Sequence, residues 1–113
     1  MMESSIFVRL QQENFHQWRQ APDEVAFLRN LHRHVFYFEI ELEVRHDDRE
    51  LEFFIVQRYL RIFTNKVVLW EGLSCEMVCK KVIEHLRYKF KDRRVCVTVS
   101  EDNENGARIH GVL

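Results

Sequence analysis

The sequence has almost no net charge and lacks a long apolar run. Its 17 basic and 18 acidic residues leave a formal charge of −1, so the chain has no bulk positive field with which to hold a nucleic-acid backbone. No apolar run approaches the roughly 20 residues that span a bilayer, and residues 1–5 resemble no secretory signal. These absences argue against a long polyanion or a membrane as partner and predict a cytosolic protein.

Cysteine is scarce, and its spacing indicates no pair. Cys75, Cys79 and Cys96 form an odd set without a CxxC motif, so we expect reduced, core-facing thiols rather than disulfides, a metal site or a redox role. Repeats and low-complexity tracts are absent as well. A chain of 113 residues with nine Phe has the usual size of one domain. We therefore expect a single domain over residues 1–113.

The sequence does contain clear strand patterns. Even-numbered positions are apolar over residues 36–44 while Glu39, Glu41 and Glu43 occupy the other face, which is typical of a half-buried antiparallel strand. Residues 6–10 alternate in the same way, and this strand is expected to run toward residue 15 and to end near Trp18. Alternation over 95–99 predicts another strand, followed by an acidic turn at 101–106 and a short strand over 107–112.

The remaining segments carry weaker signals. Residues 19–31 contain the single proline, Pro22, and are expected to form a connection with one short helical turn. A hairpin connection at 45–49 is expected to lead into a third strand over 50–56, while the signal of residues 57–70 is mixed and leaves that segment open.

One amphipathic helix is expected between Ser74, its N-cap, and residues 90–92. Its exposed residues should be Lys80, Lys81 and Arg87, and its buried residues should be Met77, Val78, Val82, Ile83 and Leu86. The predicted fold class is α+β, an antiparallel sheet with one main helix packed on one face.

Three histidines form the most informative pattern. His32 and His34 are one residue apart at the start of a strand, so their side chains point to the same face. His16 could bring a third imidazole from a neighbouring strand. Three neutral imidazoles with an open fourth position suit zinc, which binds nitrogen at about 2.0–2.1 Å. The alternative is that these imidazoles are polar caps at a strand end.

This histidine spacing resembles the His … His-Gly-His-aromatic zinc pattern of the 6-pyruvoyl- and 6-carboxytetrahydropterin synthases, which have the tunnelling fold. The resemblance covers most of the chain: residues 49–54 look like the family's Gly-Met-Val-x-Asp-Phe strand, 73–77 like its Pro-Thr-x-Glu-Asn helix start, and 97–101 like its last strand. It implies a homo-oligomer with a pocket at the subunit interface. It also implies that His16, His32 and His34 bind zinc and that Glu101 anchors the edge of a pterin or purine.

Several family features are missing. The family's catalytic cysteine lies between the first two zinc histidines, but residues 17–31 contain no cysteine, so a thiolate base is not supplied there. The Leu-Asp-His segment of the proton relay has no counterpart between Gln57 and Ser74. Arg33 replaces the glycine between the paired histidines, and a guanidinium suits a phosphate better than a neutral pterin.

These departures favour binding without turnover. Phosphate contacts are expected from arginines, purine-edge contacts from a carboxylate and amides, and base stacking from an aromatic ring. The candidates in that order are Arg33, Arg45, Arg49 and Arg108, then Glu101, Asn103 and Asn105, then Phe36 or Trp70. For each group a structural role is the alternative: surface ion pairs for Arg45 and Arg49, turn formation for the two asparagines, and core packing for Trp70.

A second resemblance points the same way. Phe-Leu-x-x-x-His-Arg-His-x-Phe and Ser-Glu-Asp-x-Glu-Asn-Gly-Ala look like segments of small phage-type proteins, among them anti-defence sponges that sequester cyclic nucleotide or cyclic ADP-ribose signals. The leading hypothesis is therefore a cytosolic homo-oligomer that captures a small purine nucleotide without turning it over. The alternatives are a divergent zinc-dependent tetrahydropterin synthase or lyase and a protein-interaction module.

Overall fold

The computed structural model describes residues 1–65 and 72–113. Along the chain the elements are β1 (Ser4–His16), η1 (Asp23–Arg29), β2 (His32–Val44), α1 (Phe53–Thr64), α2 (Cys75–Arg87), β3 (Arg94–Glu101) and β4 (Asn105–Val112). The four strands form one antiparallel sheet in the order β1-β2-β3-β4. The α+β class with an antiparallel sheet is confirmed.

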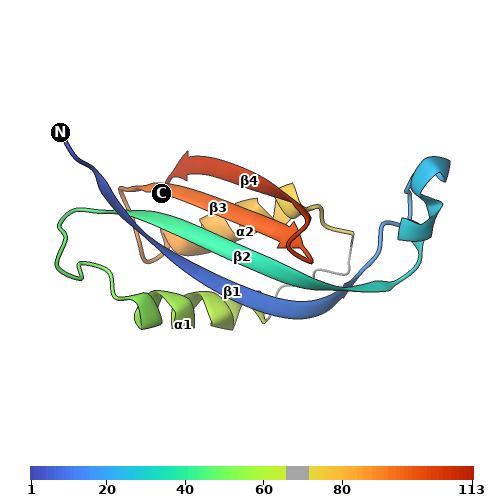
Figure 1. Ribbon diagram of the computed structural model, residues 1–113, viewed down its shortest axis with the longest axis horizontal. Coiled ribbons are helices and arrows are strands. Elements are labelled where there is room, and N and C mark those ends of the chain that lie inside the picture. The colour runs from blue at the N-terminus through green and yellow to red at the C-terminus, as the bar shows by residue number, and fades with distance from the viewer. Residues whose placement is uncertain (66–71) are drawn as a thin grey trace.

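The first two strands are longer than the last two, and the difference positions the histidines. β1 and β2 pair along their full 13 residues, from Ser4 opposite Val44 to His16 opposite His32. β3 pairs with β2 only from Leu42 to Phe36. Beyond this point β1 and β2 continue as a two-stranded ribbon toward η1 (Figure 1). His16, His32 and His34 all lie on the ribbon.

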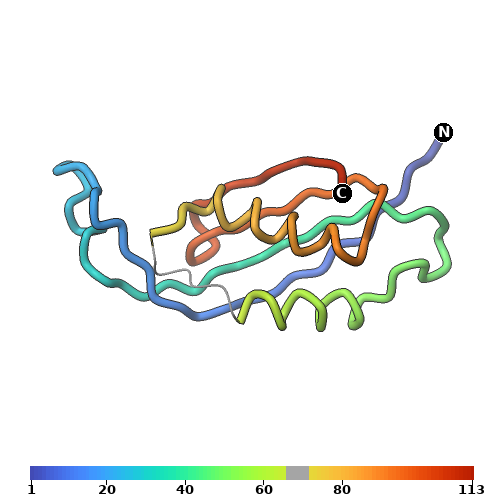
Figure 2. The backbone as a smooth tube through the Cα atoms, turned by 180° about the vertical axis from the view of Figure 1, so that it is seen from behind, coloured from blue at the N-terminus to red at the C-terminus, as the bar shows by residue number. Residues whose placement is uncertain are grey.

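Both helices cover the same face of the sheet. α2 packs on β3 and β4, while α1 packs on β1 and contacts α2 (Figures 1 and 2). The predicted alternation of β2 is confirmed, because the even-numbered side chains point into the core beneath these helices and Glu39, Glu41 and Glu43 point away from it. The fully buried β2 residues are Phe36, Phe38, Ile40 and Leu42.

Helix α2 agrees with its prediction except at Met77 and at its end, since it stops at Arg87 instead of residues 90–92. The Ser74 hydroxyl accepts a hydrogen bond from the Met77 amide at 3.2 Å, which is the expected N-cap. Val78, Val82, Ile83 and Leu86 are buried, but Met77 is 53% exposed. Met77 lies in the first turn of the helix and lines an open pocket instead of the core.

The strand predicted over residues 50–56 is wrong, and so is the hairpin predicted at 45–49, because β2 is followed by helix α1. The described residues contain two α-helices rather than one. Helix α1 occupies most of residues 50–56 and continues to Thr64, within residues 57–70, which the sequence left open. Its N-cap is Glu52, whose carboxylate accepts a hydrogen bond from the Ile55 amide at 2.8 Å. Val56, Leu60 and Thr64 are buried one turn apart. This spacing gives the helix its apolar face and outweighs the strand preference of the residues before it. Residues 66–70 of the open segment lie outside the described residues.

A buried ion pair closes the end of the sheet that is remote from the histidines. Arg93 is 6% exposed, and its two Nη atoms donate to the Glu50 carboxylate at 3.0 and 2.9 Å. Arg93 also donates to the Glu43 carbonyl at 2.9 Å, and the Arg45 amide donates to Glu50 at 2.7 Å. The Arg93 hydrogen bonds are the main reason why the pKa of Glu50 falls to about 2.

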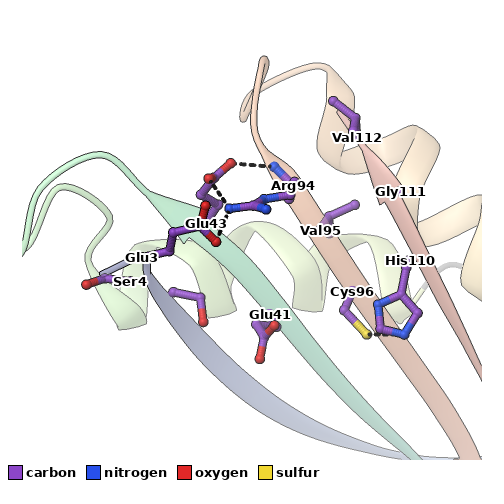
Figure 3. Close-up of a pocket in the computed structure, with 11 residues that line it drawn as sticks. Glu3, Ser4, Glu41, Glu43, Arg94, Val95, Cys96, His110, Gly111 and Val112 are labelled. Atoms are coloured by element: carbon purple, nitrogen blue, oxygen red, sulfur yellow. Dashed lines mark hydrogen bonds and ion pairs between the residues drawn. The ribbon is translucent and has the colours of Figure 1, made fainter. Parts of the chain in front are cut away.

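The other face of the sheet is covered by neither helix and carries exposed ion pairs. Arg94 bridges Glu3 and Glu43 on this face (Figure 3). Cys96 also lies there, with its Sγ 3.9 Å from His110 Nε2. The three cysteines are free, as expected, but only Cys79 is a fully buried core thiol. Cys96 is not core-facing because its position in β3 alternates with those of the buried valines.

In the described part of the chain, neither helix is long and apolar enough to pass through a lipid bilayer.

Candidate metal centre

Three imidazoles meet on the helix-covered side of the β1–β2 ribbon. His16 ends β1 and lies opposite His32, the first residue of β2, while His34 follows two positions later on the same face. The rings of His32 and His34 are 4.7 Å apart between centroids, and those of His16 and His32 are 5.3 Å apart. The three side chains predicted as zinc ligands are therefore brought together by strand pairing.

One nitrogen of each ring has a hydrogen-bond acceptor outside the cluster. His16 Nε2 lies 3.1 Å from the carbonyl oxygen of Leu73, and His32 Nδ1 lies 2.7 Å from that of Asn30. His34 Nδ1 lies 2.6 Å from a carboxylate oxygen of Asp102. A neutral imidazole has one N–H, and these acceptors select the nitrogen that bears it. The lone pairs then belong to His16 Nδ1, His32 Nε2 and His34 Nε2.

These lone-pair nitrogens face a common point. Each ring offers one nitrogen such that the three lie within 4.8 Å of one another, and His16 Nδ1 is 3.4 Å from His32 Nε2. Tetrahedral zinc with nitrogen ligands holds two of them about 3.3 Å apart. His34 Nε2 is buried and has no hydrogen-bond partner in the described residues. The donor set and its spacing fit a zinc ion with an open fourth position.

Burial favours the form of His16 that a metal requires. It lowers the pKa of His16, although the nearby Glu101 carboxylate acts in the opposite direction. A lowered pKa leaves the imidazole neutral at neutral pH, and neutral imidazole is the form that binds metal.

Glu101 and Cys75 lie beside the open side of the cluster. A Glu101 oxygen lies 3.1 Å from His34 Nε2 but out of line for a hydrogen bond, and the Cys75 thiol donates to the other oxygen at 3.8 Å. Burial, followed by the Glu101 charge, raises the pKa of Cys75 to about 12. The thiol is therefore protonated at neutral pH in the metal-free protein.

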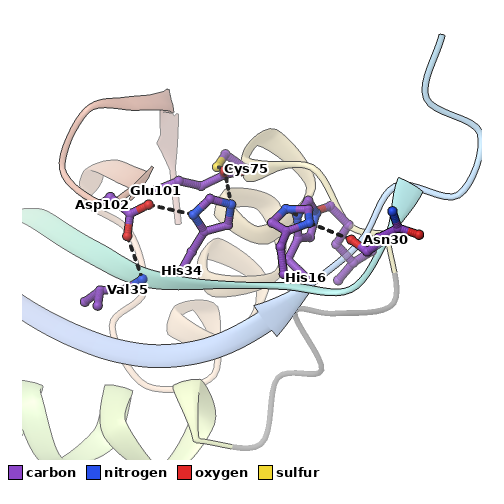
Figure 4. A network of polar contacts seen from close by, with 9 residues as sticks. His16, Asn30, His34, Val35, Cys75, Glu101 and Asp102 are labelled. Atoms are coloured by element: carbon purple, nitrogen blue, oxygen red, sulfur yellow. Dashed lines mark hydrogen bonds and ion pairs between the residues drawn. The ribbon is translucent and has the colours of Figure 1, made fainter. Parts of the chain in front are cut away.

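Asp102 connects the end of β3 to the histidine ribbon. Besides the contact with His34, its second carboxylate oxygen accepts from the Val35 amide at 2.9 Å (Figure 4). This backbone hydrogen bond, more than the one from His34, lowers the pKa of Asp102. The carboxylate is therefore charged at neutral pH.

An open pocket of about 600 Å³ adjoins the metal-facing residues. It combines the polar groups of Glu101, Cys75 and Asn105 with the apolar side chains of Trp18, Leu28 and Met77. Small-molecule sites are typically built from apolar walls with a few polar groups that fix orientation. The pocket thus has room for a small ring compound next to the cluster.

The residues predicted to contact a ligand are only partly gathered here. Glu101 and Asn105 line the pocket. Phe36 packs beneath the cluster, with its ring centroid 6.2 Å from that of His16, and at 2% exposure it has no free face on which a base could stack. Asn103 forms part of the turn, with φ of 57°, and lines a pocket on the uncovered sheet face instead.

The four predicted phosphate-binding arginines do not converge within one copy of the chain. Arg33 alternates with the histidines, so it lies on the opposite face and pairs with Glu13 at 2.8 Å. Arg108 also lies on that face, where it donates to Thr98 at 2.9 Å. Arg45 and Arg49 lie past the other end of β2. Trp70 falls outside the described residues.

Asp102, Cys75 and Trp18 are site residues that the sequence patterns do not reveal. The patterns predict an acidic turn at Asp102 and a core thiol at Cys75, because strand and helix periodicity does not show which turn residues reach a neighbouring strand. One signal is present: Asp102 directly follows Glu101, which the family resemblance places at the pocket.

Comparison with known proteins adds no assignment to this geometry. No protein-family model matches the chain, and no curated protein gives a significant match.

Proposed function

We propose that this protein binds one zinc ion through His16, His32 and His34 and holds a small nitrogen heterocycle beside it, as a divergent zinc-dependent relative of the tetrahydropterin synthases and lyases. The observation that carries the proposal is the set of three imidazole nitrogens that lie close together, one of which is buried without a hydrogen-bond partner among the described residues. The resemblance of the sequence to that family agrees with the proposal, because the same three histidines are its implied zinc ligands.

The pocket residues suggest how a ligand is held. Zinc with an open position supplies Lewis acidity toward a carbonyl or hydroxyl oxygen. Glu101 presents a carboxylate, an acceptor for the N–H groups of a pterin or purine edge, and the Asn105 amide offers both a donor and an acceptor. Trp18, Leu28 and Met77 supply apolar surface for the ring.

The primary test measures bound metal in protein purified without added chelator. Native mass spectrometry with elemental analysis should find one zinc per chain in the wild type and none in His32→Ala. His46→Ala is the matched control, because His46 is exposed in the connection between β2 and α1 and does not belong to the histidine cluster. The proposal would be contradicted if wild-type protein still contained no bound zinc after incubation with zinc.

A second candidate function is sequestration of a purine nucleotide without turnover, with the chain acting as a sponge in the cytosol. It is favoured by one observation: Glu101 and Asn105 share one pocket wall and could read a purine edge. Since the arginines are dispersed in one copy, phosphate contacts would require a homo-oligomer. A cyclic ADP-ribose-type ligand fits the same reasoning.

Turnover separates the two candidates. Zinc-loaded protein incubated with dihydroneopterin triphosphate should release a changed pterin over many cycles if it is an enzyme. The sponge predicts instead that cyclic ADP-ribose or a cyclic dinucleotide is retained unchanged, raises the thermal stability of the native form, and is seen with the subunit count in native mass spectra. If none of these compounds shifts the melting temperature, a protein-interaction role remains.

A further inference from the structure

We propose that Asp102 is a positioning residue that fixes His34 in the tautomer with its proton on Nδ1 and its lone pair on Nε2 before any metal arrives. This inference rests on the zinc site proposed above, but it concerns the metal-free protein. Asp102 itself does not touch the metal position. It acts through His34.

The contacts of Asp102 leave its carboxylate little freedom. One oxygen accepts from His34 Nδ1 at 2.6 Å and the other from the Val35 amide at 2.9 Å. The Asp102 amide donates to the Val35 carbonyl at 2.7 Å, so its main chain and its side chain are both tied to β2. In Figure 4 the Asp102 carboxylate lies between Val35 and the His34 ring. The orientation of the carboxylate is therefore set by the same strand that carries the histidine.

The backbone at this position restricts which residues can occupy it. The last pair between β2 and β3 is Phe36 with Glu101, and the chain then turns with φ of 54° at Asp102. Glycine, asparagine and aspartate tolerate this left-handed conformation best. Asparagine would keep the turn, but its single side-chain oxygen has to serve two donors where the carboxylate has two oxygens.

A second carboxylate, that of Glu101, could favour the other tautomer of His34. Glu101 has an oxygen 3.1 Å from His34 Nε2, so a ring with its proton on Nε2 could turn that proton toward Glu101. This tautomer would direct an N–H instead of a lone pair at the metal position. The short, in-line contact to Asp102 favours the other tautomer. A carboxylate behind a metal-binding histidine also increases the basicity of the ligating nitrogen.

The first test uses metal-free protein labelled with ¹⁵N histidine. At a pH above the titration of the histidines, long-range ¹H–¹⁵N spectra report which ring nitrogen carries the proton. Wild type should show His34 protonated on Nδ1. In Asp102→Asn the proton should move to Nε2 in a substantial fraction of molecules. Asp47→Asn is the matched control, since it removes one exposed carboxylate in the connection between β2 and α1, at the other end of β2.

The second test measures zinc affinity by competition with a chromophoric chelator. Removal of an acceptor behind a metal-binding histidine typically weakens metal affinity about 10- to 100-fold, and we expect this loss in Asp102→Asn but not in Asp47→Asn. A circular dichroism spectrum and melting curve like those of wild type show that Asp102→Asn is folded.

The outcomes separate the two proposals. Wild-type His34 protonated on Nε2 overturns the role of Asp102 even if zinc binds, and this measurement does not depend on whether the variant folds. Zinc affinity of Asp102→Asn equal to that of wild type also overturns it. Wild type with the expected tautomer but without zinc affinity contradicts the proposed function and leaves the positioning role standing.

Discussion

The two ends of strand β2 both bury polar groups, but they treat them differently. At the end that leads to α1, the Glu50 end, the Arg93 guanidinium meets the Glu50 carboxylate in a two-point contact, so opposite charges compensate each other within the chain. At the ribbon end, three imidazoles direct lone pairs at one another, and His34 Nε2 has no partner in the described residues. Arg93 Nε lacks a partner too, but its charge is neutralised.

This difference indicates where stability and binding are located. A buried ion pair that is complete within the protein needs nothing from outside, and loss of either partner would leave an uncompensated buried charge. A group of acceptors facing one another is unfavourable until a cation fills the space between them. The Glu50 end is therefore expected to hold the sheet to α1, and the ribbon end to bind a ligand.

The largest loss of stability is expected from Glu50→Ala at the Glu50 end. This change leaves Arg93 buried without its carboxylate, and loss of one partner from a buried pair costs about 3–5 kcal/mol. Urea unfolding at pH 7 measures it. Glu13→Ala is the control, since it breaks an exposed arginine pair with Arg33. Equal losses in the two variants would mean that the Arg93 site is hydrated.

Acid should reduce the stability that the Glu50 end contributes, within a defined pH window. The Glu50 pKa is about 2 in the folded protein against an ordinary value of 4.5, so its stabilising contribution is complete above pH 4.5. The contribution is lost as the pH falls from 4.5 through 2, because the unfolded chain binds the proton first. Unfolding free energies measured across this range should fall more steeply for wild type than for Glu50→Ala. Parallel curves would refute the assignment.

Zinc should stabilise the ribbon end by an intermediate amount. A ligand that binds only the folded form adds about 2.7 kcal/mol at a free concentration one hundred times its Kd. We expect this gain in wild type and none in His32→Ala. Without metal, the two proteins should differ by less than about 1 kcal/mol, because His32 is only half-buried. Calorimetry with and without zinc tests both statements.

The smallest effect is expected from Arg33→Ala. Its partner Glu13 and Arg33 itself are both more than half exposed, and such solvent-screened pairs contribute little to stability. Zinc loading should stay unchanged, because the Arg33 side chain lies on the face opposite the histidines. A loss of stability in chemical unfolding as large as that of Glu50→Ala would indicate that a second copy of the chain covers this face. Under the sponge hypothesis, Arg33→Ala would also weaken nucleotide retention.

The sequence predicted those features that depend on one strong periodicity or one spacing. The period-two pattern of residues 36–44 determines which face of β2 is buried, and the two-position offset from His32 to His34 puts both rings on that face. Ser74 marks the start of α2 because its side chain can cap the helix. Convergence of His16 with the other two followed from the resemblance, and strand pairing produces it.

The prediction failed where local preference and tertiary packing disagree. Phe53, Phe54, Ile55 and Val56 favour a strand one by one, but only Val56 of the four is buried, with Leu60 one turn later. Read over a longer window, the four-residue spacing would have indicated a helix. The outer contacts of the histidines were not predictable in this way, since they depend on two main-chain carbonyls and a turn residue from separate segments.

Those contacts mean that the His-Arg-His motif cannot be moved elsewhere as a unit. The acceptors behind the three rings belong to Leu73, two residues before α2, to Asn30 in the connection before β2, and to Asp102 in the turn after β3. Grafting the motif onto an unrelated hairpin would copy two histidines and leave their ring orientations unset. The ring orientations of the cluster therefore depend on the connections between elements, and designers seeking to reuse it would need to transplant the loops along with the strands.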